Sequence, residues 1–289
     1  MINGSTVLVG LLGNPVRHSL SPAMQNAALE AMAMNWSYLA LPCESNALAD
    51  VLSGLHAVGC RGLNVTIPHK QSVAALCREL TPLAKRLGAV NTLIPLESGG
   101  WRGTNTDMEG FLAPLGNPSQ WTGRRALVLG CGGSARAVVA GLQTLNLAEI
   151  TVVGRRSETL DPFLRDLSTD QAPLKGCLEC DPSLQDKISA MDLVVNTTPV
   201  GMDQHGDADA MPLNQAIWKA LSESATLYDL IYTPRPTPWL AWGAQGKHRC
   251  IDGLEMLVQQ GAAALRLWSG CNDIPVAAMR SAAETALKL

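Results

Sequence analysis

Short apolar runs alternate with helical segments along most of this 289-residue chain. Thr6–Leu12 is an apolar run that ends at Gly13 and predicts a buried strand, and a pattern of helical period follows over Ala23–Met34. Trp36–Leu41 predicts a second strand and Asn46–His56 a second helix. Strands and helices that alternate in this way favour an α/β fold.

A strand, a glycine-rich turn and a helix follow one another in the middle of the chain. The strand is expected over Arg125–Leu129, the turn contains Gly130, Gly132 and Gly133, and the helix runs over Ala135–Asn146. Gly130 suits a tight turn, and Gly132 lets a pyrophosphate approach the backbone at the helix N-terminus. The last glycine of the usual G-x-G-x-x-G spacing is missing, and a plain strand-to-helix turn is the alternative.

Two arginines follow the next predicted strand, Ile150–Val153, in the run Gly154-Arg155-Arg156. A site for NAD places an acidic residue near this point, where it binds the ribose 2′-hydroxyl. Guanidinium groups suit a 2′-phosphate instead, because each offers a planar fork of donors that is always charged. The sequence therefore favours NADP over NAD, with two solvated arginines as the alternative.

Polar side chains gather at several predicted strand ends in the first half of the chain. Two hydroxyls, Ser19 and Ser21, follow the first strand, where open α/β sheets place ligands. The strand over Leu63–Ile67 carries its polar residues on one face and closes on Lys70, with Thr66 and Pro68 expected to open a helix. Structural alternatives stay open: Ser21 and Asp107 are good helix caps, and Lys70 can be a solvated lysine beside an edge strand. The polar residues in question are Ser19, Ser21, Asn64, Thr66, Lys70, Asn91, Thr92, Asn105, Thr106 and Asp107.

Proline-rich stretches punctuate the second half. Pro114–Pro118 is rich in turn residues and is expected to be a linker between domains. Pro234–Pro238 holds three prolines in five residues and is expected to be a rigid loop that leaves the second domain. Two helices are predicted near the end of the chain, over Leu254–Ser269 and Pro275–Leu287.

Composition limits the classes of function. Hydrophobic residues make up 47% and charged residues 16%, which is typical of a globular protein, and the net charge of −3 gives no basic field to attract nucleic acid. No apolar run reaches the length of a membrane span, and the N-terminal run is too short for a signal peptide, so a cytoplasmic protein is expected. The eight cysteines are expected to be reduced thiols, and Cys177 and Cys180 have no second ligand pair, so no metal site is expected.

Six motifs, taken in order, cover nearly the whole chain. They are Ser19-Leu-Ser21-Pro22, Asn64-Val-Thr66-Ile-Pro-His-Lys70, Gly88-Ala-Val-Asn91-Thr92, Asn105-Thr106-Asp107, Gly130-Cys-Gly132-Gly133 and Asp252-Gly253-Leu254. This ordered set resembles the shikimate dehydrogenase family. The resemblance implies an N-terminal α/β substrate-binding domain (1–113), a Rossmann-like NADP-binding domain (114–245) and C-terminal helices (246–289) that pack back on the first domain.

The resemblance also implies residue roles. Lys70 and Asp107 would be catalytic. Ser19 and Ser21 would bind the shikimate carboxylate, Asn64, Thr66, Asn91 and Asp107 the ring hydroxyls, and Tyr232 and Gln260 further parts of the substrate. The cofactor would be bound by Gly130, Gly132, Gly133, Ser134, Ala135, Arg155, Arg156, Thr197, Thr198, Gly253 and Met256. The family often has Asn-Arg-Thr where this chain has Gly154-Arg155-Arg156, which replaces an amide and a hydroxyl with a glycine and a second cation.

The implied reaction is the NADPH-dependent, reversible reduction of 3-dehydroshikimate to shikimate in aromatic amino-acid biosynthesis. The partners implied are these small molecules, with no nucleic acid and no membrane, and a homodimer stays open. Two alternatives are a broad-specificity quinate/shikimate dehydrogenase that uses NAD, and a non-catalytic metabolite-sensing homologue. The double arginine argues against the first, and the presence of both Lys70 and Asp107 argues against the second.

Overall fold

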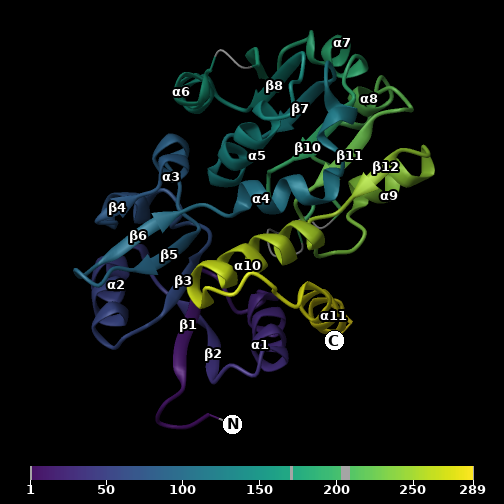
Figure 1. Ribbon diagram of the computed structural model, residues 1–289. Helices are drawn as coiled ribbons and strands as arrows, with labels where there is room; N and C mark the ends of the chain where they lie inside the picture. Colours follow the sequence, from purple (N-terminus) through teal and green to yellow (C-terminus); the bar gives the residue numbers. More distant parts are fainter. Residues whose placement is uncertain (1, 170–171, 203–208, 289) are drawn as a thin grey trace. The chain divides into compact units, whose positions relative to one another are not determined.

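The structure is a computed structural model that describes residues 2–169, 172–202 and 209–288. The chain forms two compact units, Met1–Gly110 together with Leu257–Leu289, and Phe111–Met256 (Figure 1). The chain passes from the first unit to the second within helix α4 (Asp107–Leu112) and back within helix α10 (Leu254–Ser269). Each unit has a six-stranded sheet of its own.

The first sheet is mixed, with the strand order β2-β1-β3-β5-β6-β4. The first three strands in this order are parallel, whereas β5 runs antiparallel to both of its neighbours, β3 and β6. The mixed pattern brings the end of β3 beside the start of β5, where several of the polar motifs lie. The strands are β1 (Val7–Gly13), β2 (Trp36–Pro42), β3 (Gly62–Val65), β4 (Glu79–Leu80), β5 (Thr92–Pro95) and β6 (Trp101–Thr104).

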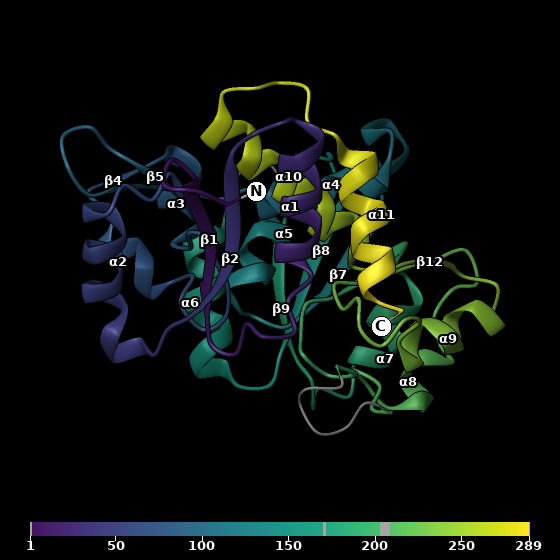
Figure 2. The same cartoon turned by 90° about the horizontal axis from the view of Figure 1, so that it is seen from below.

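Helices pack on the first sheet through apolar side chains. Leu48 and Leu52 of α2 join Leu12 and Leu63 of the strands in one buried cluster. Figure 2 shows α1 beside α11, and the two helices pack against each other. The helices of this unit, besides α10, are α1 (Ser21–Ala31), the 3-10 turn η1 (Ser45–Ala47), α2 (Leu48–Ala57), the 3-10 turn η2 (Ser72–Leu76), α3 (Pro82–Leu87) and α11 (Val276–Ala286).

The second sheet is wholly parallel, with the strand order β12-β11-β10-β7-β8-β9. This is the doubly wound order of a Rossmann fold, in which the winding direction reverses between β7 and β10. Ligands bind such sheets at the carboxyl ends of the strands beside that reversal. The strands are β7 (Arg125–Leu129), β8 (Glu149–Gly154), β9 (Leu174–Leu178), β10 (Leu193–Asn196), β11 (Thr226–Asp229) and β12 (Arg249–Ile251).

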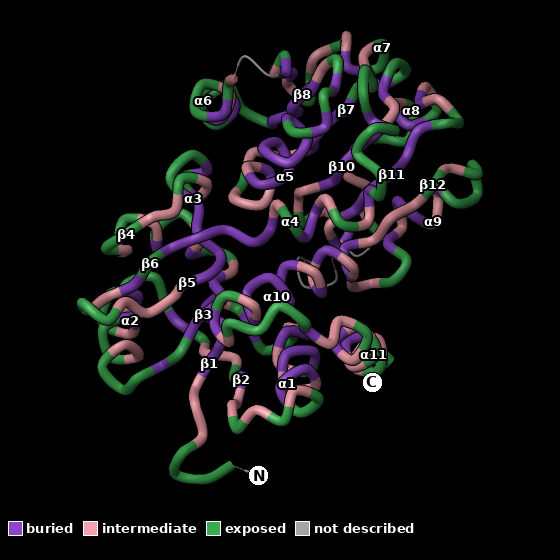
Figure 3. The backbone as a smooth tube through the Cα atoms, viewed as in Figure 1, coloured by how far each residue is buried: buried purple, intermediate pink, exposed green. Residues whose placement is uncertain are grey.

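The centre of the second unit is apolar on both faces of its sheet. Leu127, Val152 and Val194 are fully buried, as expected for parallel strands that are covered on both sides. Figure 3 shows the central strands and α5 largely in the colour of buried residues. The helices of this unit, besides parts of α4 and α10, are the 3-10 turns η3 (Ala113–Leu115) and η4 (Pro118–Trp121), α5 (Gly133–Gln143), α6 (Ser157–Leu167), α7 (Leu184–Ser189), α8 (Gln215–Trp218) and α9 (Pro238–Gln245).

Both proline-rich stretches lie inside the second unit, so the prediction that they connect the domains is wrong. Pro114 and Pro118 begin η3 and η4, because proline suits the first positions of a helix. Trp121 is buried and donates from its indole to the Leu115 carbonyl at 3.1 Å. Arg249, from β12, also donates to the Pro114 carbonyl at 3.1 Å, so the turn residues pack on this unit instead of forming an exposed linker.

Two further differences from the sequence predictions are local. The segment after Pro68 forms turns followed by η2, not a helix that opens at Thr66, because the Lys70 carbonyl accepts from Val90 N at 2.7 Å and is held in a loop. The stretch from residue 246 onward begins with a strand, since β12 pairs with β11. The boundaries between the compact units accordingly fall after Gly110 and Met256, whereas the sequence placed them after residues 113 and 245. No helix in the described ranges is long and apolar enough to cross a membrane.

Candidate active site

Lys70 and Asp107, which are distant in sequence, meet in the first unit. Lys70 lies in the turns after β3 and Asp107 is the first residue of α4. The Lys70 ammonium donates to Asp107 Oδ2 at 2.6 Å, and the two side chains are only 13% and 5% exposed. The pair is therefore a largely desolvated ion pair, which differs from the solvated lysine that the sequence left open.

Asn91 orients the carboxylate of Asp107 from the opposite side. Its Nδ2 donates to Asp107 Oδ1 at 2.7 Å, while its Oδ1 accepts from the Thr106 backbone N–H at 2.8 Å. Asn105 Oδ1 accepts from the Asp107 backbone N–H at 3.0 Å. Both carboxylate oxygens of Asp107 are thus bound by side chains, so its position is explained by more than helix capping.

Asn64 and Thr92 extend this network along the sheet. Asn64 Nδ2 donates to the Asn91 carbonyl and to Thr92 Oγ1, both at 3.2 Å, and Thr92 Oγ1 donates to Asn91 Oδ1 at 2.9 Å. All three residues are buried. Because a buried polar group without a partner is costly, such a connected network holds its members in one arrangement.

Tyr38 joins the network and was missed in the sequence analysis. Its hydroxyl donates to Asn64 Oδ1 at 2.8 Å, although strand β1 separates β2 from β3. Burial raises the pKa of the Tyr38 hydroxyl, and the Ser21 side chain partly opposes this shift. The available signal was that a buried tyrosine needs a hydrogen-bond partner, although the sequence does not show which polar residue lies near it.

The two candidate serines lie at the start of α1. Ser19 Oγ accepts from the Ser21 backbone N–H at 3.2 Å. Ser21 is buried in the first turn of the helix, and the N-cap position belongs to Leu20 without a side-chain cap. The capping alternative for Ser21 is therefore wrong, because the helix begins one residue earlier than its sequence suggests.

Two other candidate substrate residues of the first unit lie outside this network. Thr66 is half-buried after β3, and its backbone N–H donates to the Leu12 carbonyl at 2.8 Å. Gln260 is in α10, where its amide donates to the Leu257 carbonyl of the same helix at 2.8 Å. Within the described residues, neither side chain has a hydrogen bond to the Lys70–Asp107 pair.

The glycine-rich turn lies at the reversal of the second sheet. Gly130 has a φ of +102°, and a Cβ atom there would lie 2.8 Å from Thr197 Oγ1 and 3.1 Å from Thr198 Cγ2. Thr197 Oγ1 donates to the Leu129 carbonyl at 2.6 Å, which fixes the turn after β10 against the end of β7. Glycine is therefore required at position 130, and the two candidate threonines adjoin the candidate phosphate turn.

Gly132 has the opposite environment. A Cβ atom on Gly132 would meet no protein atom within 4 Å, and the residue is the N-cap of α5. The helix N-terminus at Gly133, Ser134 and Ala135 offers backbone N–H groups to an anion there. Open space beside such donors fits the pyrophosphate of a dinucleotide.

Arg155 and Arg156 follow β8 directly, beside the turn after β7 in the strand order. Both are exposed, and neither forms an ion pair with another described residue. Arg136, near the start of α5, is different, because it binds Asp166 at 2.8 Å and lies over the Phe163 ring. Two arginines without ion pairs among the described residues, placed at this strand end, fit a phosphate on the adenosine ribose.

The remaining candidates of the second unit lie after β11 and β12. A Cβ atom on Gly253 would lie 2.0 Å from the Leu230 carbonyl oxygen, so only glycine allows this approach of the two loops. Met256 is buried in the first turn of α10. Burial raises the pKa of the Tyr232 hydroxyl.

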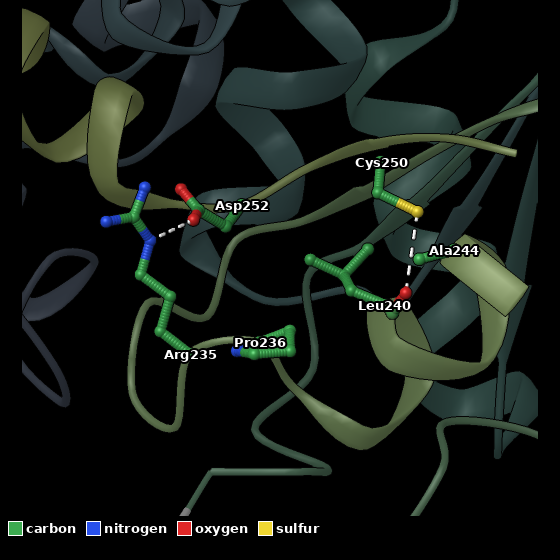
Figure 4. Close-up of a pocket in the computed structure, with 6 residues that line it drawn as sticks. All are labelled: Arg235, Pro236, Leu240, Ala244, Cys250 and Asp252. Carbon is green, nitrogen blue, oxygen red and sulfur yellow. Dashed lines mark hydrogen bonds and ion pairs between the residues drawn. The ribbon is translucent and has the colours of Figure 1, made fainter.

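A pocket of about 430 Å³ lies in the second unit, between the loop after β11, α9 and β12 (Figure 4). Arg235 Nε and Asp252 Oδ2 form an ion pair of 2.5 Å at one side. The Cys250 thiol points at the Leu240 carbonyl, at 3.5 Å, and burial raises the pKa of this thiol. None of the residues predicted to bind cofactor or substrate lines this pocket, whose lining is Arg235, Pro236, Leu240, Ala244, Cys250 and Asp252.

Comparison with known proteins identifies the family. Residues 11–93 match the family described as shikimate dehydrogenase substrate binding domain, and residues 253–284 match shikimate 5′-dehydrogenase C-terminal domain. A Synechocystis protein named shikimate dehydrogenase (NADP(+)) is 49% identical over 284 residues, which cover 97% of this chain and 96% of the relative. The chain belongs to the shikimate dehydrogenase family. A Prochlorococcus marinus relative of the same name is 41% identical over 98% of both chains.

Solved structures of the shikimate dehydrogenase family have the same fold. A shikimate dehydrogenase in complex with NADP+ superimposes with a TM-score of 0.85 at 31% identity, covering 99% of this chain and 97% of the other. The Thermus thermophilus enzyme in complex with NADP(H) and shikimate gives 0.84 at 35% identity, with 97% and 99% coverage. A 5-ketofructose reductase of a Gluconobacter species also gives 0.84, at 27% identity with 98% and 99% coverage, so proteins of different names share this fold.

Proposed function

We propose that this chain catalyses the NADP-dependent, reversible reduction of 3-dehydroshikimate to shikimate. The observation that carries the proposal is the Lys70–Asp107 ion pair, buried and oriented by Asn91 in the unit that includes the matched substrate-binding region. The names of relatives that align over nearly the full chain support the same reaction. In the shikimate pathway, this step belongs to aromatic amino-acid biosynthesis.

Lys70 supplies the proton chemistry in this proposal. Reduction of a ketone places negative charge on its oxygen, and a positioned ammonium stabilises that charge and donates the proton. Asp107 holds the ammonium at 2.6 Å, and Asn91 holds Asp107. In the oxidation of shikimate, the neutral amine form of the same lysine takes up the hydroxyl proton and becomes the ammonium. Bound NADPH supplies the hydride.

The polar groups around this pair would bind the substrate. Ser19 and Ser21 at the start of α1 suit the carboxylate, and Asn64, Thr66 and Asn91 suit ring hydroxyls. The buried network supports this assignment, because it holds Asn64 and Asn91 in fixed orientations before a substrate arrives. Gln260 and Tyr232 are proposed as further substrate contacts, on the resemblance alone.

The second unit would hold NADP. Gly130, Gly132 and Gly133, with Ser134 and Ala135, would receive the pyrophosphate, and Arg155 and Arg156 the 2′-phosphate. Thr197 and Thr198 adjoin the turn, while Gly253 and Met256 are proposed to lie near the nicotinamide. The fit rests on the open space at Gly132 and on the two arginines without ion pairs among the described residues.

An absorbance assay of NADPH oxidation with 3-dehydroshikimate tests the reaction. The proposal expects turnover with NADPH and reverse turnover with shikimate and NADP. A purified, folded protein that binds both ligands but turns over neither would contradict it and would favour a metabolite-sensing role.

We further propose a cytoplasmic location, since all eight cysteines are free thiols. We also propose a homodimer, which light scattering in solution tests.

A further inference from the structure

Tyr38 lies at the junction of two groups that are proposed to bind opposite parts of the substrate. Its hydroxyl donates to Asn64 Oδ1 at 2.8 Å, and its backbone is bound by the side chain of Asn26 in α1. Ser21 belongs to the start of α1 and Asn64 to β3. Tyr38 therefore connects Asn64, a proposed hydroxyl-binding residue, to α1, whose start carries the proposed carboxylate-binding residue Ser21.

The surroundings hold Tyr38 firmly in this place. The side chain of Asn26 in α1 makes two hydrogen bonds to the backbone of Tyr38. The Tyr38 N–H donates to Asn26 Oδ1 at 2.8 Å, and Asn26 Nδ2 donates to the Tyr38 carbonyl at 2.9 Å. The Tyr38 ring packs against the Trp268 ring, with centroids 6.3 Å apart, and the residue is 1% exposed. The hydroxyl position is thus set by both the backbone and the ring.

The hydrogen bonds of Asn64 show what the Tyr38 hydroxyl determines. Both Nδ2 protons of Asn64 are used, one by the Asn91 carbonyl and one by Thr92 Oγ1, and one lone pair of Oδ1 is used by Tyr38. A side-chain amide has two donors and two acceptor positions, so one lone pair on Oδ1 is left for a ligand. Asn64 therefore presents an acceptor, which requires a hydroxyl donor on the substrate.

We propose that Tyr38 is a positioning residue for substrate specificity, which orients Asn64 so that it accepts a hydrogen bond from one ring hydroxyl. This inference rests on the proposed function and goes beyond it by naming the residue that sets the polarity that Asn64 presents to the substrate. Without the phenol hydroxyl, Asn64 Oδ1 loses its fixed donor, and the amide can turn its NH₂ group toward the substrate.

The test is Tyr38→Phe, which removes the hydroxyl and keeps the ring that packs on Trp268. We expect the KM for shikimate to rise about tenfold, the effect of losing one well-placed hydrogen bond, while kcat changes less than about threefold and the KM for NADP stays the same. Tyr228→Phe is the matched control, because Tyr228 is also buried and its hydroxyl donates to the Phe111 carbonyl in the other unit. The control should leave the shikimate KM unchanged.

Deoxy analogues of shikimate, each lacking one ring hydroxyl, separate positioning from general loosening. For the analogue that lacks the hydroxyl donating to Asn64, the KM values of the wild type and Tyr38→Phe should converge. For the other analogues, the difference in KM between the two proteins should persist. An equal penalty with every analogue, or an unchanged shikimate KM, would overturn the inference while wild-type turnover still supported the proposed function. A wild-type protein without turnover would instead overturn the proposed function.

Discussion

Asn91 Nδ2 donates to Asp107 Oδ1 at 2.7 Å, on the carboxylate oxygen opposite the one that binds Lys70. The amide thus holds the carboxylate, and the carboxylate holds the ammonium. Asn91 also accepts from the Thr106 backbone through Oδ1, so its own orientation is set by the loop that leads into α4. The proposed proton donor is therefore positioned by a chain of buried hydrogen bonds.

Replacing Asn91 should affect both activity and stability. Asn91→Ala leaves Asp107 Oδ1 and the Thr106 N–H without their partners, and a buried polar group without a partner costs about 1–3 kcal/mol. We expect a loss of that size in the free energy of unfolding, measured with urea, and at least a tenfold lower kcat, about 1.4 kcal/mol. Asn117→Ala is the control for activity, since Asn117 caps the exposed start of η4 in the second unit and should leave kcat unchanged. A variant with normal kcat would show that Asp107 does not need Asn91.

Gly130 and Gly132 of the turn should respond differently to the same change. Gly130→Ala adds a methyl group against Thr197 at a positive φ, so it should destabilise the fold by more than about 1 kcal/mol. Gly132→Ala adds a methyl group to open space, so the melting temperature should stay normal while the Kd for NADP rises about tenfold, or about 1.4 kcal/mol. Calorimetry and NADP titration check both. Normal NADP binding by Gly132→Ala would place the pyrophosphate elsewhere.

Arg155 and Arg156 should set the preference for NADP. Charge-assisted hydrogen bonds contribute about 1.5–3 kcal/mol, so replacing both arginines with Gln should weaken NADPH more than tenfold while NADH changes little. The measurement is kcat/KM with each cofactor. Arg165→Gln, which removes an exposed charge from the same unit, is the control. A double variant that keeps its preference for NADPH would refute the role of these arginines.

Asp229 should make stability depend on pH. Burial raises its pKa to about 6 from an ordinary value of 3.8, although Thr237, Ile231 and Asn196 donate to it. Between these values the folded protein binds more protons than the unfolded chain, so this contribution is fully present below pH 3.8 and is lost as pH rises through about 6. Asp229→Asn should therefore flatten the fall in unfolding free energy over that range, which urea titrations at several pH values measure. Parallel pH profiles of wild type and variant would contradict the assignment.

Much of the fold follows from local patterns in the sequence. Apolar runs such as Arg125–Leu129 predict the buried strands, and glycines after them predict the turn, because a strand end and a tight turn are local requirements. Predictions failed where long-range packing decides. The Pro114–Pro118 stretch looked like a linker, yet Arg249, 135 residues further along the chain, donates to the Pro114 carbonyl within the second unit.

The site shows the same division between local and long-range information. Lys70 and Asp107 could be nominated from motifs, because each lies where a strand gives way to a loop or helix. Tyr38 could not, since its partner Asn64 is brought close only by the strand order β2-β1-β3. An apolar strand that contains one tyrosine predicts that the tyrosine is buried, but it does not predict which residue accepts a hydrogen bond from the tyrosine hydroxyl.

The most direct test of the account is the kinetics of Lys70→Ala, with Lys85→Ala as the control because Lys85 is an exposed lysine of α3 in the same unit. Positioned acid–base groups contribute about 10²–10⁴-fold to the rate, so kcat of Lys70→Ala for shikimate oxidation should fall by that factor while KM changes little. The kcat of Asp107→Asn should fall less, because the amide can still orient the lysine. Lys85→Ala should behave as the wild type. A Lys70→Ala enzyme with near-normal kcat and only a raised KM would show that Lys70 binds the substrate and does not carry the proton transfer.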